Sequence, residues 1–222
     1  MSAGEDIVQR LARIDCCALS DALDKLGLAG TVTGLRPLSA ERRIAGRVRT
    51  VKLVRASDVP PATKPRHLGT TAIERAEPGE IIVVEQRTGI DCGSWGGILS
   101  LGAKVRGVSG VIADGPVRDV DEARQMDFPV FARATTAFTA RGRVAEASTD
   151  EPIQVGDVTV SAGDYVAADG SGVVFIRASD AEIVLDAAES IAAREAVMAR
   201  ALLSGKPITE VMGANYETML ER

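Results

Sequence analysis

Apolar positions recur with two different periods along the chain, and the period separates helical from extended stretches. Over 5–14 and 18–26 apolar residues return every three or four positions, which predicts two helices. Between 31 and 56 they fall in short runs among Arg and Thr, a pattern typical of β-strands. A long helix is predicted over 180–204 and shorter ones over 206–222. One stripe of the long helix, at i+3 and i+4 spacing, consists of Val184, Ala188, Ile191, Glu195, Met198 and Leu202.

The middle of the chain alternates strands with helices. Its first strand, EIIVVE (80–85), is a continuous apolar run, as expected for a strand that is covered on both faces. A helix over 97–107, a strand over 108–114, a short helix VDEARQM and a strand over 129–134 follow, and short strands fill 141–177. This order predicts a parallel sheet, whose ligands usually lie at the carboxyl ends of the strands.

The composition indicates one soluble globular domain covering 1–222. The chain has 222 residues, of which 45% are apolar and 26% charged, so it can bury a core without disulfides or a structural metal. The 26 Lys and Arg against 31 Asp and Glu give a net charge of −5, and only 3% of the residues are aromatic. We therefore expect no nucleic-acid partner, because nucleic-acid binding favours basic patches and stacking aromatics.

Cysteine and histidine narrow the kinds of site further. Cys16, Cys17 and Cys92 fit neither a disulfide framework nor a zinc site, so we expect a reduced, cytoplasmic location. His67 is the only histidine, which excludes a metal site built from several histidines; its place at a helix start predicts a surface or capping role. No stretch approaches 18 apolar residues and the N-terminus lacks an apolar signal core, so no membrane association is expected.

Two polar segments reach the predicted ligand edge of the sheet. Gly96-Gly97 opens a helix, where free amides and the helix dipole favour an anion such as a carboxylate, although a tight turn without a ligand is the alternative. Arg118-Asp119 follows a strand; the Arg can bind a carboxylate or an enolate oxygen, and the Asp a hard cation. The alternative is a capping box, with Asp119 as the N-cap and Glu122 reaching back.

Other residues have more ordinary interpretations. Asp114 precedes Gly115-Pro116 and is expected to form a turn. Cys92 and Trp95 either line the site or are packed. Glu195 interrupts the apolar stripe of the long helix, so it is paired with an Arg, lies at a subunit interface, or reaches a site on a neighbouring chain. The ion pair within the chain is the interpretation favoured by composition.

The segment GGILSLGAKVRGVSGVIADGPVRDVDE (96–122) resembles the signature of the RraA-like proteins, which include 4-hydroxy-4-methyl-2-oxoglutarate aldolases and ribonuclease E regulators. The matching spacing is Gly97, twenty residues, Arg118-Asp119, two residues and an acid. The segments CCALSDALDKLG, ERAEPGEIIVVE, GDYVAADGSGVVFIR and REAVMARALLSG resemble the family elsewhere, so the resemblance covers nearly the whole chain.

The resemblance implies an α/β fold, a three-layer β/β/α swivelling domain whose C-terminal helices pack on a neighbouring subunit in a homotrimer or hexamer. It also implies a divalent-metal-dependent lyase that cleaves C–C bonds next to a 2-keto group and decarboxylates oxaloacetate. Asp119 would then hold Mg²⁺ or Mn²⁺, and Arg118 the keto oxygen. The substrate carboxylate would bind the backbone amides of Gly96, Gly97, Ile98 and Leu99.

The resemblance also implies roles for two further carboxylates, Glu122 and Glu195, and this chain departs from many members of the family at Gly97. Many relatives carry an acidic residue where this chain has Gly97; Glu122 is the nearest replacement, and its implied role is catalytic, to orient a water bound to the metal. Glu195 aligns with a C-terminal Glu that reaches the site from the adjacent chain, where its implied catalytic role is to relay a proton to the enolate through a metal-bound water. A regulator without catalytic activity, which binds a ribonuclease or another protein, is the alternative function. The Arg-Asp-x-x-Glu set together with the glycine turn favours the enzyme.

Overall fold

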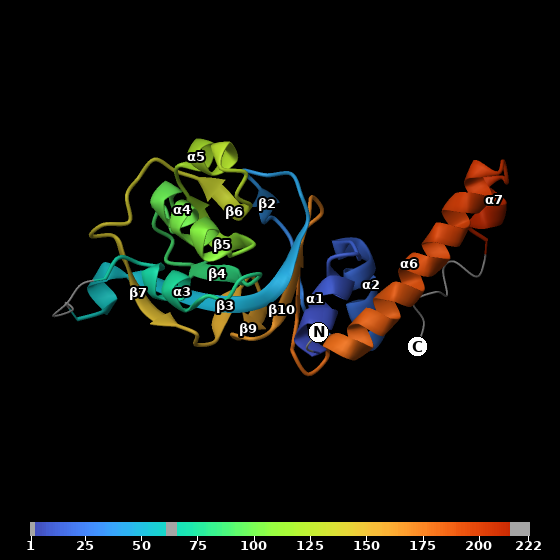
Figure 1. Cartoon of the computed structure of the whole chain (residues 1–222), viewed down its shortest axis with the longest axis horizontal. Helices are drawn as coiled ribbons and strands as arrows, with labels where there is room; N and C mark the ends of the chain where they lie inside the picture. Colours follow the sequence, from blue (N-terminus) through green and yellow to red (C-terminus); the bar gives the residue numbers. More distant parts are fainter. Residues whose placement is uncertain (1–2, 61–65, 214–222) are drawn as a thin grey trace.

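A curled sheet of nine strands forms the centre of the computed structural model, which describes residues 3–60 and 66–213 (Figure 1). The strands follow the order β1-β11-β10-β3-β4-β5-β6-β2, and β7 also pairs with β3. Their bounds are β1 Thr31–Val32, β2 Arg36–Pro37, β3 Ile44–Arg55, β4 Ile81–Gln86, β5 Gly110–Val117, β6 Val130–Thr135, β7 Val144–Thr149, β10 Tyr165–Ala168 and β11 Val173–Ile176. A separate hairpin consists of β8 (Ile153–Val155) and β9 (Val158–Val160).

The strands β3, β4, β5 and β6 run parallel, which confirms the predicted parallel sheet. Successive residues of a strand face opposite sides, so Ile82 and Val84 lie in one core cluster while Ile81 and Val83 lie in another. The first cluster is covered by three helices, which are α3 (Thr70–Arg75), α4 (Gly97–Arg106) and α5 (Val120–Gln125). The second lies under the hairpin and the curled strands β10 and β11. The β/β/α layer order that the resemblance implied is therefore confirmed.

A second group of helices packs on the outer side of β10 and β11. It consists of α1 (Ala3–Leu11), α2 (Cys16–Leu26) and α6 (Ala181–Leu203), so the long helix predicted over 180–204 is confirmed. Arg10 of α1 joins α1 to α6 through ion pairs of 2.6–2.8 Å with Glu182, Asp186 and Glu189.

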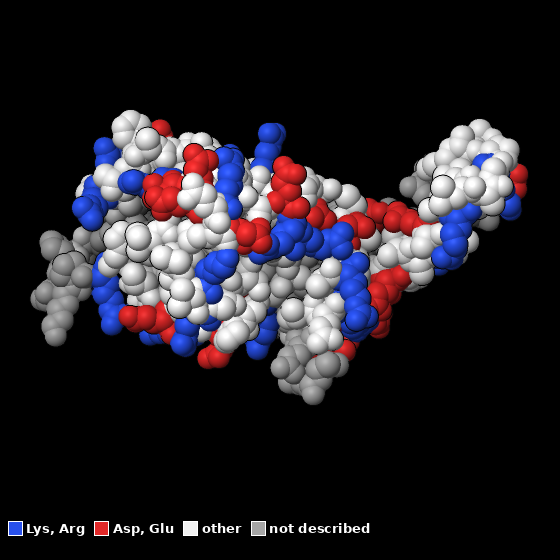
Figure 2. Space-filling model, turned by 45° about the horizontal axis from the view of Figure 1, so that its top comes forward, with Lys and Arg blue, Asp and Glu red and all other residues white. Residues whose placement is uncertain are grey.

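The second half of α6 leaves the body of the molecule. Ile191 is its last buried residue, and beyond it α6 and the short α7 (Ile208–Val211) extend away (Figure 1). Figure 2 shows Lys and Arg interspersed with Asp and Glu over the face in view. None of the helices in the described part combines the length and apolar character needed to cross a membrane. Of the predicted tail helices, residues 214–222 lie outside the described part.

The expected turn at Asp114 is wrong. The strand β5 runs on through Gly115 and Pro116 to Val117, and the register with β6 shifts between Ala113 and Pro116. The irregularity in the ladder accommodates the Pro, which cannot donate to it. Asp114 is 6% exposed and is held by Arg133 Nε at 2.7 Å and by the amide of Gly156 at 2.7 Å. Hydrogen bonds from residues far away in the sequence thus hold the Asp114 carboxylate within a strand, although the local sequence predicts a turn there.

Candidate active site

The two predicted polar segments meet at the carboxyl ends of β4 and β5. The loop that follows β4 runs beside the end of β5, because the amide of Ser94 donates to the carbonyl of Pro116 at 2.8 Å and that of Arg118 to the carbonyl of Trp95 at 3.0 Å. These bonds place the start of α4 directly next to Arg118 and Asp119. The convergence expected from the strand order is therefore present.

Asp119 bonds across to α4 and does not cap its own helix. Its backbone is left-handed, with φ 57° and ψ 38°, and its side chain makes no capping bond at α5. Its Oδ2 accepts from the amide of Gly97 at 3.1 Å, and Arg118 Nε donates to both of its oxygens at 3.1 and 3.2 Å. The capping-box interpretation is wrong, because this backbone turns the carboxylate toward the first turn of α4. Asp tolerates such a backbone better than most residues do.

Glycines in the loop allow this close approach. A Cβ at Gly93 would lie 2.8 Å from Cγ of Arg118, so only glycine lets the stem of the arginine cross the loop there. At Gly97 a Cβ would lie 1.7 Å from Oε2 of Glu122, which is an exposed residue of α5. The structure therefore brings Glu122 to the same helix start as Asp119.

Backbone amides in the first turn of α4 remain available to bind an anion. The amide of Gly97 already donates to Asp119, so the role expected for it in binding a substrate carboxylate is taken up within the chain. Ile98 and Leu99 follow in the first turn, where backbone amides have no acceptor within the helix. Ile98 is 80% exposed and Leu99 7% exposed, and both line the same hollow as Gly96.

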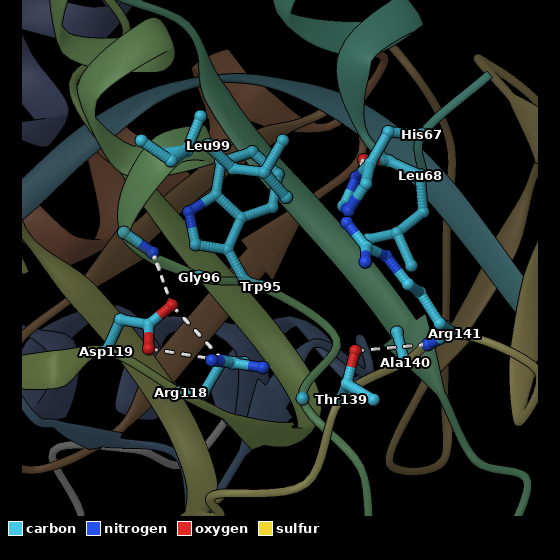
Figure 3. A pocket seen from close by; sticks show the side chains of 13 residues that line it. His67, Leu68, Trp95, Gly96, Leu99, Arg118, Asp119, Thr139, Ala140 and Arg141 are labelled. Atoms are coloured by element: carbon cyan, nitrogen blue, oxygen red, sulfur yellow. Dashed lines mark hydrogen bonds and ion pairs between the residues drawn. The ribbon is translucent and has the colours of Figure 1, made fainter.

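A cavity of about 440 Å³ opens over these residues. Figure 3 shows Arg118 and Asp119 on one side of it and His67 and Arg141 on the other. Trp95 forms part of the wall; it is 2% exposed and donates from Nε1 to Ser100 Oγ at 3.0 Å, which fixes the indole ring. The cavity thus has a polar end at Asp119, an apolar wall and two basic side chains opposite.

Sequence reasoning missed two of these residues. His67 is exposed as expected, and its carbonyl accepts from Thr70 Oγ1 at 2.7 Å, but its ring also lines the cavity. Arg141 comes from the segment between β6 and β7, which carries no motif. Cys92, by contrast, is fully buried beside Gln86, whose Nε2 lies 3.4 Å from its sulfur, and burial raises the pKa of its thiol. Cys92 is therefore packed and does not line the site.

The carboxylates fit only a loosely held cation. Asp119 and Glu122 supply carboxylate oxygens, the donors that Mg²⁺ and Mn²⁺ prefer, and Mg²⁺ commonly takes one or two carboxylates and completes its shell with water or substrate. Within residues 3–60 and 66–213, no three His, Cys, Asp or Glu side chains are grouped to hold a metal ion. A hard, exchangeable divalent cation fits this donor set, whereas a structural zinc ion does not.

Glu195 does not reach this cavity within its own chain. It lies on α6, past Ile191, which is the last buried residue of that helix. Its side chain is exposed, and it forms no ion pair in the described part of the chain, so the favoured pairing with an Arg is wrong. Partial burial raises the pKa of the Glu195 carboxyl, and the negative charges of Asp15 and Asp21 raise it further.

Comparison with known proteins places this geometry in a family. Residues 16–175 match the model of the RraA-like family, described as Aldolase/RraA. The chain is 30% identical over 205 residues to a Halalkalibacterium halodurans protein named "Putative 4-hydroxy-4-methyl-2-oxoglutarate aldolase", with 91% of each chain covered. It is 27% identical to Protein DlpA of Legionella pneumophila, over 92% of this chain but only 33% of that protein.

A solved structure agrees with the fold. An uncharacterized protein from Pseudomonas syringae pv. tomato superimposes with a TM-score of 0.83 and 25% identity, over 96% of this chain and all of that one. The family match spans the helix start at Gly97 and the Arg118-Asp119 pair, which are the residues that build the cavity. The chain belongs to the RraA-like family.

Proposed function

We propose that the protein is a cytoplasmic, divalent-metal-dependent lyase that cleaves the C–C bond of 4-hydroxy-4-methyl-2-oxoglutarate-like acids to release pyruvate, and that it also decarboxylates oxaloacetate. One observation carries the proposal: Arg118, Asp119 and the first-turn amides of α4 converge on one cavity. The name of the Halalkalibacterium relative supports the substrate class.

The residues of α4 and β5 suit a 2-keto acid. The amides of Ile98 and Leu99 hold the carboxylate next to the keto group, because the first turn of a helix favours an anion. Arg118 uses only its Nε toward Asp119, and its guanidinium extends toward the middle of the cavity (Figure 3). Its remaining N–H groups hold the keto oxygen and offset the charge that develops there as the bond breaks.

The bond changes are the same for both substrates. In retro-aldol cleavage the 4-hydroxyl loses its proton and the C3–C4 electron pair moves to the keto group, which leaves the enolate of pyruvate and a carbonyl product. In oxaloacetate the same electron pair is released as CO₂ departs. In both cases the enolate then takes up a proton at carbon and becomes pyruvate. One site therefore serves both reactions.

Asp119 and Glu122 would hold the cation, and Mg²⁺ or Mn²⁺ fits their oxygens. When bound, the cation supplies positive charge against the enolate oxygen. Asp119 also keeps Arg118 in place, since the two side chains are only 37% and 30% exposed and are joined through Nε. Loss of Asp119 would thus remove a cation ligand and release the arginine together.

We further propose that Glu195 of a neighbouring copy completes the site in a homotrimer or hexamer. In its own chain Glu195 is not among the residues that line the cavity, and it lies on α6 past the last buried residue, Ile191. The C-terminal end of α6 extends from the body of the molecule (Figure 1). That extension exposes apolar side chains, with Val197 57% and Leu203 89% exposed, which is the surface expected of a subunit contact. A carboxyl there holds the proton that the enolate carbon takes up.

The decisive experiment measures pyruvate release from oxaloacetate and from 4-hydroxy-4-methyl-2-oxoglutarate. Each substrate is incubated with Mg²⁺, with Mn²⁺ and with excess EDTA, and the rate without protein is subtracted because oxaloacetate decarboxylates spontaneously. We expect release that disappears with EDTA and returns when the metal is restored. No release above the blank with either metal would refute the lyase and leave the regulator as the function to test. Full activity after exhaustive chelation would refute the metal role.

A further inference from the structure

We propose that Arg141 binds the second carboxylate of the substrate and thereby selects acids that carry a carboxylate on the half that leaves as the carbonyl product. This inference deepens the proposed function and rests on it, because it assigns the far side of the same cavity. The carbonyl product is then an oxo acid and not a simple aldehyde or ketone.

The pyruvate half of the substrate uses only one side of the cavity. Figure 3 shows Arg118 and Asp119 on that side and Arg141 on the opposite one. The buried side chains of Leu68 and Trp95 also line the cavity, and they suit the carbon chain that joins the two carboxylates. The volume of about 440 Å³ lies within the range of about 300–1,000 Å³ that is usual for small-molecule sites. The cavity therefore has space for a ligand with a second polar end.

Arg141 supplies positive charge on the far side of the cavity. Across from it, the charges of Arg118 and Asp119 offset each other through a contact of 3.1 Å. The backbone amide of Arg141 donates to Thr139 Oγ1 at 3.3 Å, but its guanidinium makes no hydrogen bond or ion pair in the part of the chain that the structure describes. A guanidinium presents a planar fork of N–H donors, which matches a carboxylate with two parallel hydrogen bonds. This side of the cavity is therefore suited to a carboxylate.

His67 lines the same side but is less suited to a carboxylate than Arg141 is. Its Nδ1 lies 3.1 Å from the carbonyl oxygen of Leu68. A carbonyl oxygen only accepts, so Nδ1 carries the hydrogen, and Nε2 of the neutral ring is then an acceptor. An acceptor suits a hydroxyl group and repels a carboxylate oxygen. Arg141 is thus the group for the second carboxylate.

The segment that carries Arg141 is fixed to the loops that build the site. The amide of Thr136 donates to the carbonyl of Val117, at the end of β5, at 2.9 Å. The carbonyl of Phe138 accepts from the amide of Gly93, in the loop that follows β4, at 3.0 Å. The same strand ends that position Arg118 therefore also set the place of Arg141.

Arg141 should affect the two proposed reactions differently. In retro-aldol cleavage the second carboxylate keeps its charge while the C3–C4 bond breaks, so an arginine that holds it binds the substrate and the transition state alike. In oxaloacetate the second carboxylate is the group that departs, and its negative charge moves to the keto oxygen as CO₂ forms. A cation that holds this carboxylate does not promote its loss. Arg141→Ala should therefore raise KM for 4-hydroxy-4-methyl-2-oxoglutarate without lowering kcat for oxaloacetate, and a lowered kcat for oxaloacetate would overturn the inference.

Binding of two keto acids that the proposed reactions do not cleave tests the inference without turnover. The probes are 2-oxoglutarate and 2-oxopentanoate, which share a five-carbon chain and differ in the second carboxylate; each is titrated calorimetrically at the same Mg²⁺ concentration. The unaltered protein should bind 2-oxoglutarate at least about fivefold more tightly, a smaller factor than is usual for a hydrogen bond between charged groups because water reaches the exposed Arg141. Arg141→Ala should bind both acids about equally, and Arg141→Lys should keep part of the difference.

Arg66→Ala is the matched control. Arg66 is an exposed arginine beside His67, pairs with Glu74 at 3.0 Å and is not among the described residues that line the cavity. Its loss should leave the ratio of the two Kd values within twofold. Weakening of both acids to the same extent by Arg141→Ala, or equal affinity of the unaltered protein for both acids, would overturn the inference and leave the proposed function intact. Unaltered protein that binds neither acid would overturn both.

Discussion

Replacement of Arg118 by Ala should abolish most of the activity while leaving the fold almost unchanged. The guanidinium extends into the cavity, and within the described part of the chain its hydrogen bonds come from a single nitrogen, Nε, which donates to Asp119 at 3.1 and 3.2 Å. Removal of a group that meets charge in the transition state costs about 10²–10³ in kcat, or about 2.7–4 kcal/mol. We therefore expect kcat for pyruvate release to fall at least 100-fold.

The effect on folding should be far smaller. The Arg118 and Asp119 side chains are 37% and 30% exposed, so solvent screens their attraction, and such a pair contributes about 0.2–1 kcal/mol. In a chain of this size 1 kcal/mol moves the Tm by about 2–4 °C. Differential scanning calorimetry should therefore find Tm within about 4 °C of the unaltered protein.

Arg124→Ala is the matched control for this experiment. Arg124 is an exposed arginine of α5 that pairs with Asp121 and donates from Nε to the carbonyl of Leu38 at 2.9 Å. Its loss should cost a similar amount of stability and leave kcat within about twofold. The reasoning fails if Arg118→Ala keeps its kcat, or if both variants lose activity only in proportion to a lowered Tm.

Three further predictions concern the rest of the chain. Mixing inactive Arg118→Ala with inactive Glu195→Gln protein under proven subunit exchange should restore part of the pyruvate release; no recovery would mean that Glu195 does not act across subunits. Native protein should react with a thiol reagent rapidly at exposed Cys17 only, since burial raises the pKa of Cys16 and protects the other two thiols, and mass spectrometry of the labelled peptides would show it. Burial tends to raise the pKa of Asp169, but amide donors from Cys16 and Ser171 outweigh it and the net pKa is lowered. The ionised Asp169 therefore contributes its full stabilisation above the ordinary pKa of 3.8, and this stabilisation is lost as the pH falls through the lower pKa of the folded protein. The Tm of Asp169→Asn should be lower than that of the unaltered protein at pH 7, and this difference should shrink below pH 3.8. A difference that stays constant with pH would contradict the reasoning.

The amino-acid sequence alone determined the elements around the site and their meeting point. Backbone geometry over a few neighbouring residues determines whether a segment forms a strand or a helix, and the spacing of apolar residues reflects that geometry. This is why the sequence predicted β4, α4 and the apolar start of β5. Because parallel strands end at one edge, their order also predicted that Gly97 would meet Arg118.

Only the tertiary structure decided how the individual carboxylates are used. Asp114 and Asp119 both carry strong local signals, for a turn and for a helix cap, yet each is held by partners from other elements, Arg133 for the first and the amide of Gly97 for the second. Local propensities are worth about 1 kcal/mol, so a buried or bridging contact to a residue 19 or 22 positions away can outweigh them. The sequence did not predict that His67 and Arg141 line the cavity for the same reason: they are brought to it by the tertiary fold, and no local sequence pattern near either residue indicates the cavity.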